Sequence, residues 1–187
     1  MKTVIKMLST LTLIGILSGG LLAFVNGWAD PLIKANQKAE TEKAIFLVNP
    51  EGKSYSKIET KLLEAYKVLD ESNKLIGYSI AREGNGFQGK IRIMIGVSEN
   101  LESINSIEIL EQTETPGLGT KVTEDPFTSQ FKSLETSPVV EWVKAVPPSK
   151  PNEIQAVTGA TISSKAVVQI INDGISVARE LKKKGDL

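Results

Sequence analysis

The sequence predicts an α+β fold in which one N-terminal transmembrane helix precedes an antiparallel-sheet domain flanked by helices. Three observations carry this prediction. Residues 7–25 hold no charged side chain, the apolar residues between 62 and 110 alternate with a period of two, and those between 162 and 184 recur with the period of a helix. We therefore expect a membrane anchor at residues 1–27 and one folded domain at residues 28–187.

The composition narrows the chemistry that this chain can perform. It has no cysteine and no histidine, which excludes thiol nucleophiles, disulfides and Ser-His-Asp triads and argues against zinc and iron–sulfur sites. Lys2 and Lys6 precede the apolar segment, so 20 basic residues face 22 acidic ones after it. A slightly acidic domain is not expected to bind nucleic acid. We therefore expect no metal site and no catalytic residues, with chemistry supplied by a bound cofactor.

The N-terminal segment has the length and flanks of a membrane anchor. Its 19 uncharged residues, 7–25, approach the roughly 20 that a helix needs to cross the hydrocarbon core. Lys2 and Lys6 before it place the N-terminus in the cytoplasm, and Trp28 suits the opposite interface. We expect a single-pass protein of the cell (inner) membrane whose C-terminal domain lies outside the cytoplasm.

Two other interpretations of this segment stay open. A cleaved signal peptide has the same charged start, and residues 25–27 offer small side chains for cleavage, but its apolar core usually spans about 7–15 residues. A buried core helix is the third option, although such helices carry a polar face and this segment shows none.

The remaining elements follow from periodicity and turn residues. Residues 31–47 predict a helix capped by Asp30 with Pro31 in its first turn. Short turn-rich breaks between the following strands predict antiparallel neighbours. The predicted strands are residues 62–68, 75–81, 91–97, 104–110 and 139–146, with Trp142 packing from the last of them.

The last predicted helix, residues 162–184, is the clearest element. It ends with three lysines and Gly185, which suit the C-terminal end of a helix. The side chains on its apolar face are Val167, Ile170, Ile171, Ile175, Ala178 and Leu181.

A loop of small residues, 158–161, directly precedes this helix. Small side chains let a ligand approach the backbone, and the free N–H groups of a first helical turn attract phosphate. Thr158, Thr161 and Ser163 add hydroxyl groups at the same end. From the residues alone, a simpler interpretation is that Thr161 or Ser163 only caps the helix.

Two further loops are rich in glycine. Residues 114–119 follow a predicted strand and combine two glycines with a proline, a composition typical of a turn. They lack the spacing and the following helix of a dinucleotide-binding fingerprint. Residues 84–89 carry one aromatic side chain, Phe87, and by themselves predict a hairpin loop.

In combination and in this order, these segments resemble the FMN-binding domain family, and within it the G subunits of the Rnf complexes. Residues 86–91, 114–119 and 158–161 carry the resemblance together with the single anchor helix. The chain departs from the family pattern at Gln155, where an aspartate is usual, and at Gln112, where histidine is frequent.

The resemblance implies that a flavin transferase esterifies Thr161 with the phosphate of FMN, making a covalent flavoprotein. Thr158, Gly159 and Ala160 would then form the attachment sequence, with Ser163 beside it. The matching loop near the flavin consists of Glu114, Thr115, Pro116, Gly117, Leu118 and Gly119, with Phe87 close to the ring.

The implied function is electron transport in a membrane-bound, ion-translocating ferredoxin:NAD oxidoreductase, with other membrane subunits and the lipid bilayer as partners. Three alternatives stay open. They are the C subunit of the sodium-translocating NADH:quinone oxidoreductase, a stand-alone extracytoplasmic flavin carrier, and a non-redox anchored assembly module.

Overall fold

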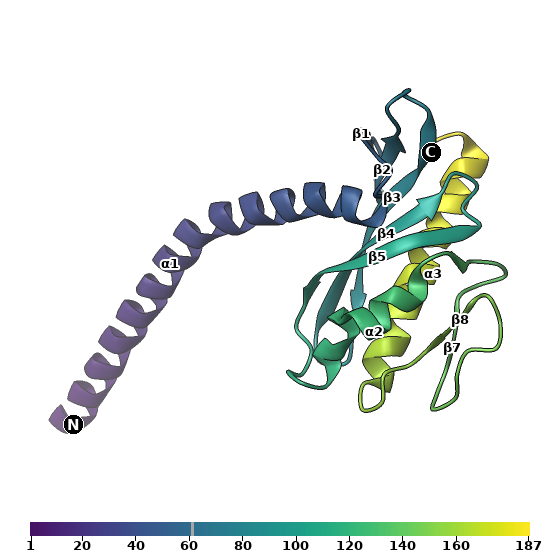
Figure 1. Ribbon diagram of the computed structural model, residues 1–187. Helices are drawn as coiled ribbons and strands as arrows, with labels where there is room; N and C mark the ends of the chain where they lie inside the picture. Colours follow the sequence, from purple (N-terminus) through teal and green to yellow (C-terminus); the bar gives the residue numbers. More distant parts are fainter. Residues whose placement is uncertain (61) are drawn as a thin grey trace. The chain divides into compact units, whose positions relative to one another are not determined.

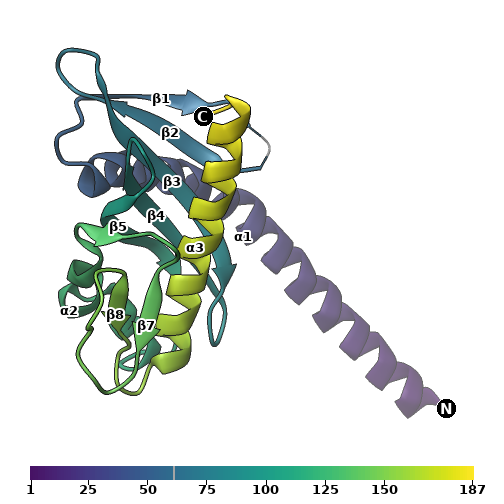
Figure 2. The same ribbon diagram turned by 90° about the vertical axis from the view of Figure 1, so that its right-hand side faces the viewer.

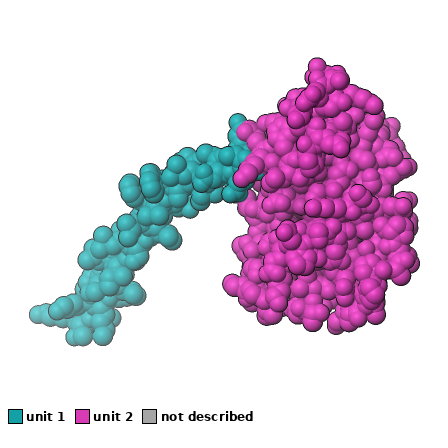
Figure 3. Space-filling view, viewed as in Figure 1, with its two compact units in different colours: residues 1–40 teal, residues 41–187 magenta. Residues whose placement is uncertain are grey.

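The computed structural model describes residues 1–60 and 62–187, which form two compact units (Figure 3). Unit 1, residues 1–40, is helical: α1 (Lys2–Val48) begins there and ends inside unit 2, residues 41–187. Leu11 and Leu22 are 70% and 72% exposed, and most other apolar side chains of this segment are also exposed. Among the described residues, α1 is the helix that is long and apolar enough to cross a membrane. A helix that is apolar on all sides is stable in lipid.

Residues 31–47 are helical as predicted, but a separate start at Pro31 is wrong, because α1 continues through Pro31 without a break. A proline inside a helix removes one backbone hydrogen bond and crowds the carbonyl four residues earlier. Pro31 lies beyond the apolar residues 7–25, and α1 tolerates it there without ending. Asp30 therefore lies within the helix and does not cap one.

Six strands of unit 2 form one antiparallel meander in the order β1-β2-β3-β4-β5-β6 (Figure 1). The order confirms that sequential strands are antiparallel neighbours, and four of the predicted strands correspond to β2–β5. Neither β1 nor β6 was predicted. The bounds are Ser54–Ile58, Glu64–Leu69, Leu75–Asn85, Lys90–Ser98, Ser103–Gln112 and Leu134–Glu135.

Strand β3 extends beyond the predicted end at residue 81, so Gly84 and Asn85 belong to the strand and not to the turn. They pair with Ile91 and Lys90 of β4. Gly84 has no side chain because Ile170 of the last helix occupies that space: a Cβ there would lie 2.5 Å from Ile170 Cγ1.

Helices cover both faces of the sheet. The last helix, α3 (Thr161–Lys184), lies across one face (Figure 2), and all six predicted side chains of its apolar face are buried. Residues 41–48 at the end of α1 pack on the other face through Ala44, Ile45 and Val48. Strand β4 is therefore buried on both sides, with Ile93, Met94 and Ile95 at 0% exposure.

The predicted strand at 139–146 shortens to β7 (Glu141–Val143), which pairs in parallel with β8 (Glu153–Gln155) as a separate two-stranded sheet. The ladder ends where the Val140 backbone bonds to the Asn172 side chain before β7 and where Ala145 after it adopts a φ of +58°. Trp142 packs partly buried against the core, as expected. Between β5 and β6 lie three short helical segments that the sequence did not predict, namely η1 (Gly119–Thr123), α2 (Asp125–Thr128) and η2 (Ser129–Phe131).

Candidate functional site

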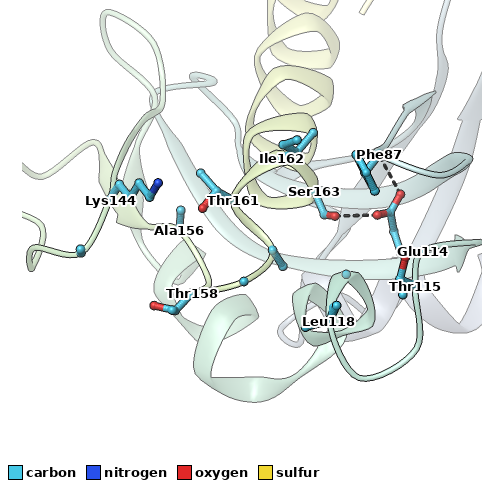
Figure 4. A pocket seen from close by; sticks show the side chains of 14 residues that line it. Phe87, Glu114, Thr115, Leu118, Lys144, Ala156, Thr158, Thr161, Ile162 and Ser163 are labelled. Atoms are coloured by element: carbon cyan, nitrogen blue, oxygen red, sulfur yellow. Dashed lines mark hydrogen bonds between the residues drawn. The ribbon is translucent and has the colours of Figure 1, made fainter.

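A cavity of about 470 Å³ opens at the start of α3 (Figure 4). Five segments line it: the β3–β4 turn, the loop after β5, the residues after β7, the β8–α3 loop and the first turn of α3. The lining residues are Phe87, Glu114, Thr115, Leu118, Gly119, Lys144, Ala145, Ala156, Thr158, Gly159, Ala160, Thr161, Ile162 and Ser163.

Ten of the twelve residues predicted from the sequence line this one cavity. Pro116 and Gly117 belong to the same loop but are not part of the lining. The sequence motifs missed four lining residues, Lys144, Ala145, Ala156 and Ile162. Ala156 and Ile162 lie close to the two ends of the attachment loop in sequence, so adjacency could have suggested them. Nothing in the sequence pointed to the segment after β7.

The carboxylate of Glu114 joins three of the lining segments. The side chain is buried, at 4% exposure. Its Oε1 accepts the backbone N–H groups of Phe87 at 2.8 Å and Gln88 at 3.1 Å, and its Oε2 accepts the Ser163 hydroxyl at 2.5 Å. The backbone N–H of Glu114 is held by Gln112 Oε1 at 2.6 Å. A buried carboxylate needs such donors, because desolvation is costly without them.

Two glycines make room for this carboxylate. A Cβ at Gly86 would run into Glu114 Oε1, and one at Gly119 would lie 2.6 Å from Glu114 Oε2 and 3.0 Å from Ser163 Oγ. Gly117, by contrast, faces open space and is needed for its backbone, with φ at +73°. Gly119 of the 114–119 loop and Gly86 of the β3–β4 turn therefore both leave space for the Glu114 carboxylate.

The capping interpretation of Thr161 and Ser163 is wrong. Ala160 is the N-cap of α3, and no side chain caps the helix, because the Ser163 hydroxyl is directed to Glu114. The loop before the helix is held instead by Ser164, whose Oγ accepts the Val157 N–H at 3.0 Å and donates to the Ala160 carbonyl at 3.0 Å. The positive end of the helix therefore faces the cavity without a bound carboxylate or hydroxyl.

The rim of the cavity is apolar. Phe87, Leu118 and Ile162 are 63%, 50% and 58% exposed, although large apolar side chains are most often buried. They come from three different segments and border one opening. Such a rim fits a flat aromatic ligand, and exposed apolar groups around a concave site are typical of ligand binding.

The β7–β8 pair fixes the remaining wall of the cavity. Glu141, Trp142 and Val143 pair with β8 residues, and the Ala156 N–H donates to the Val143 carbonyl at 2.9 Å. Gln155 is held through its backbone: its N–H donates to Gln130 Oε1 at 2.7 Å and its carbonyl accepts Gln130 Nε2 at 3.2 Å.

The loop between β7 and β8 is anchored by Glu153. Its carboxylate accepts the Ser149 N–H at 2.9 Å, the Ser149 hydroxyl at 3.1 Å and the Lys150 N–H at 3.2 Å, and it pairs with the Lys150 ammonium at 3.0 Å. The Ser149 N–H and then the Lys150 contacts lower the pKa of Glu153 from 4.5 to about 2.

These features fit a phosphorylated flavin. A hydroxyl, Thr161, lies at an uncapped helix N-terminus where phosphate binds favourably. The cavity volume of about 470 Å³ is within the usual range of about 300–1,000 Å³ for small-molecule sites. The sequence contains neither histidine nor cysteine, so the cavity has no imidazole or thiol group.

Fold and cavity together define a small α+β ligand-binding domain that follows one apolar helix, and residues 86–176 match the family model described as FMN-binding domain. Residues 86–176 therefore belong to the FMN-binding domain family.

Among known proteins the chain is similar to the G subunits of ion-translocating complexes. It is 26% identical over 182 residues, 93% of this chain and 94% of the relative, to the G subunit of the ion-translocating oxidoreductase complex of Methanosarcina acetivorans. It is 39% identical over 128 residues to the G subunit of the Na(+)-translocating ferredoxin:NAD(+) oxidoreductase complex of Acetobacterium woodii, covering 66% of this chain and 58% of that protein. The crystal structure of Shewanella oneidensis NqrC shares the fold, with a TM-score of 0.58 and 23% identity over 75% of this chain and 73% of that one.

Removing the Glu114 carboxylate is expected to loosen the whole site. Glu114→Ala leaves the buried Ser163 hydroxyl and two partly buried backbone N–H groups without their acceptor, and an unsatisfied buried donor costs about 1–3 kcal/mol. We expect the free energy of unfolding to fall by about 2–4 kcal/mol, measured by urea titration of the detergent-solubilised protein. Glu180→Ala, an exposed site on α3, is the control. Equal unfolding midpoints for the two variants would contradict the role assigned to Glu114.

Acid should weaken the domain through Glu153. Because folding lowers the pKa of this carboxyl from 4.5 to about 2, its stabilising effect is complete above about pH 4.5 and is lost as the pH falls toward 2. In Glu153→Gln, this part of the acid destabilisation should disappear from unfolding curves taken between about pH 2 and 6. An unchanged pH dependence in Glu153→Gln, matching that of Glu180→Gln, would show that another group is responsible.

Proposed function

We propose that this protein is an electron-carrying subunit of a membrane-bound, ion-translocating ferredoxin:NAD oxidoreductase complex, and that it holds FMN covalently by a phosphoester to Thr161. One observation carries the proposal. Thr161 lines a cavity at the uncapped start of α3. It lies within residues 86–176, which match the FMN-binding domain, and relatives of the chain are named as G subunits of such complexes.

The attachment chemistry follows from the group available. The Thr161 oxygen forms a bond to the phosphorus of FMN and loses its proton. Esterification by free FMN would have to expel water, so an activated donor is needed, namely an FMN-containing anhydride whose second phosphate-bearing half leaves when its P–O bond breaks. A flavin transferase catalyses this transfer from the anhydride. The product is a phosphodiester with one negative charge.

The helix N-terminus is suited to that charge. The first N–H groups of α3 have no capping side chain, and such groups stabilise an anion at this end of a helix. Gly159, with φ at +87°, gives the loop a backbone conformation that disfavours other residues. Thr158 and Ala160 complete the loop around the attachment point.

Bound FMN would supply the redox chemistry, because none of the side chains in the described cavity wall is itself redox-active. The contribution of the chain is to orient and shield the ring. Phe87, Leu118 and Ile162 offer apolar surface at the rim, while Glu114 keeps the three segments that carry them in register. Of the two charged side chains in the described lining, Glu114 is taken up by its hydrogen bonds to Phe87 and Ser163, and we infer that the domain acts as a relay.

The anchor determines on which side of the membrane the flavin domain lies. We propose that α1 crosses the cell membrane with its N-terminus in the cytoplasm, which puts residues 28–187 outside it. Covalent attachment is useful there, since a freely dissociating FMN would be diluted away. The electron donors and acceptors are then the membrane subunits of the complex.

The C subunit of the sodium-translocating NADH:quinone oxidoreductase is the nearest alternative, since the same fold occurs in NqrC. The match over 94% of the length of the Methanosarcina acetivorans G subunit favours the first assignment. A stand-alone flavin carrier would share the site but lack partner subunits, and an assembly module would lack flavin.

Covalent flavin is the most direct test. Produced together with a flavin transferase and denatured, the 20.2 kDa chain should give a band with ultraviolet-excited flavin fluorescence. Thr161→Ala should abolish the fluorescence because it removes the esterified oxygen, whereas Thr158→Ala should only weaken it. A dark band for the natural chain would sink the proposal, and a fluorescent Thr161→Ala band would move the attachment elsewhere.

The orientation can be measured by cysteine labelling, because the chain has no cysteine of its own. In spheroplasts, a membrane-impermeant maleimide should label Ser176→Cys, an exposed position on α3. Thr3→Cys, at the cytoplasmic end, should react only after lysis. The reverse pattern would show that the domain faces the cytoplasm.

A further inference from the structure

Lys144 is the one charged side chain among the four lining residues that the sequence motifs missed. It follows β7 directly and is exposed at the edge of the cavity. In Figure 4 its ammonium end is directed toward Thr161, on the side away from Glu114. The segment after β7 and the first turn of α3 thus bring one cation and one hydroxyl to the same opening.

The position of Lys144 is built into the fold. Its neighbour Val143 pairs with Gln155 in the parallel β7–β8 ladder and accepts the Ala156 N–H at 2.9 Å. The attachment loop begins three residues after Gln155, so the register of this ladder determines which residue after β7 stands opposite Thr161. Ala145 turns the chain immediately after Lys144, with φ at +58°, an uncommon conformation for a residue with a side chain.

The charged groups around the cavity leave the Lys144 ammonium available to pair with a bound anion. Among the residues described as lining it, Lys144 is the one cation and Glu114 the one anion. Glu114 is occupied by Phe87, Gln88 and Ser163. The neighbouring Lys150 is paired with Glu141 and Glu153, whereas no ion pair involving Lys144 occurs in the part of the chain that the structure describes.

We propose that Lys144 is a cofactor-binding residue that pairs with the phosphate esterified to Thr161. This inference rests on the proposed function, because the anion is the phosphodiester of that attachment. The ammonium and the N–H groups of α3 then approach one phosphate from two sides. The same lysine draws the anionic donor to the Thr161 oxygen during attachment.

The test uses the full-length chain produced with a flavin transferase. Lys144→Gln removes the charge at similar size, Lys144→Arg keeps it, and Lys165→Gln removes an exposed cation of α3 that does not line the cavity. Two quantities are measured: the initial rate at which the fluorescent band accumulates, and the ³¹P resonance of the phosphodiester in the purified, detergent-solubilised protein.

We expect attachment to slow about two- to fivefold in Lys144→Gln, the effect of one exposed ion pair, and the ³¹P resonance to move. Lys144→Arg should restore the rate, and Lys165→Gln should match the natural chain in both measurements. Unfolding curves confirm that all variants fold. Equal rates and an unmoved resonance in Lys144→Gln would overturn the proposal, as would a rate in Lys144→Arg as low as in Lys144→Gln.

The two proposals fail differently. If Thr161 is not the attachment site, the natural chain carries no flavin or Thr161→Ala keeps it, whatever happens at position 144. If only the Lys144 proposal is wrong, Thr161→Ala is dark while Lys144→Gln and Lys165→Gln behave alike.

Discussion

The site depends on one buried carboxylate. Glu114 accepts hydrogen bonds from the β3–β4 turn and from Ser163 in the first turn of α3, and it lies in the loop after β5. A charge with little exposure is stable only while these donors surround it. The three segments therefore hold one another in place, although Glu114 and Ser163 are separated by 49 residues along the chain.

Space around that carboxylate explains the glycines. Gly86 and Gly119 lie where a side chain would collide with Glu114, whereas Gly117 adopts a positive φ that favours glycine. Ser163 is engaged by Glu114 and does not cap α3, so the helix start stays open to an anion beside Thr161. Fastening one hydroxyl to the carboxylate thus leaves the helix start free for a ligand.

The scaffold behind the site is a sheet covered on both faces. Burying β4 between α3 and residues 41–48 removes most of its side chains from water, and this apolar burial is the dominant favourable term in folding. The loops that leave the strands then line one cavity at the start of α3. The residue directly after β7, Lys144, adds a cation to this cavity.

Local patterns were enough for the apolar helix, strands β2–β5 and the buried face of α3, because periodicity records which side of an element meets the core. Together with the family resemblance they also identified ten residues around the cavity. Three features were visible only in the three-dimensional structure. Helix α1 continues through Pro31, β7 and β8 pair in parallel, and no hydroxyl side chain caps α3. The position of Lys144 opposite Thr161 belongs with these, because β7 and β8 pair in parallel and no hairpin turn joins them whose length would indicate their register.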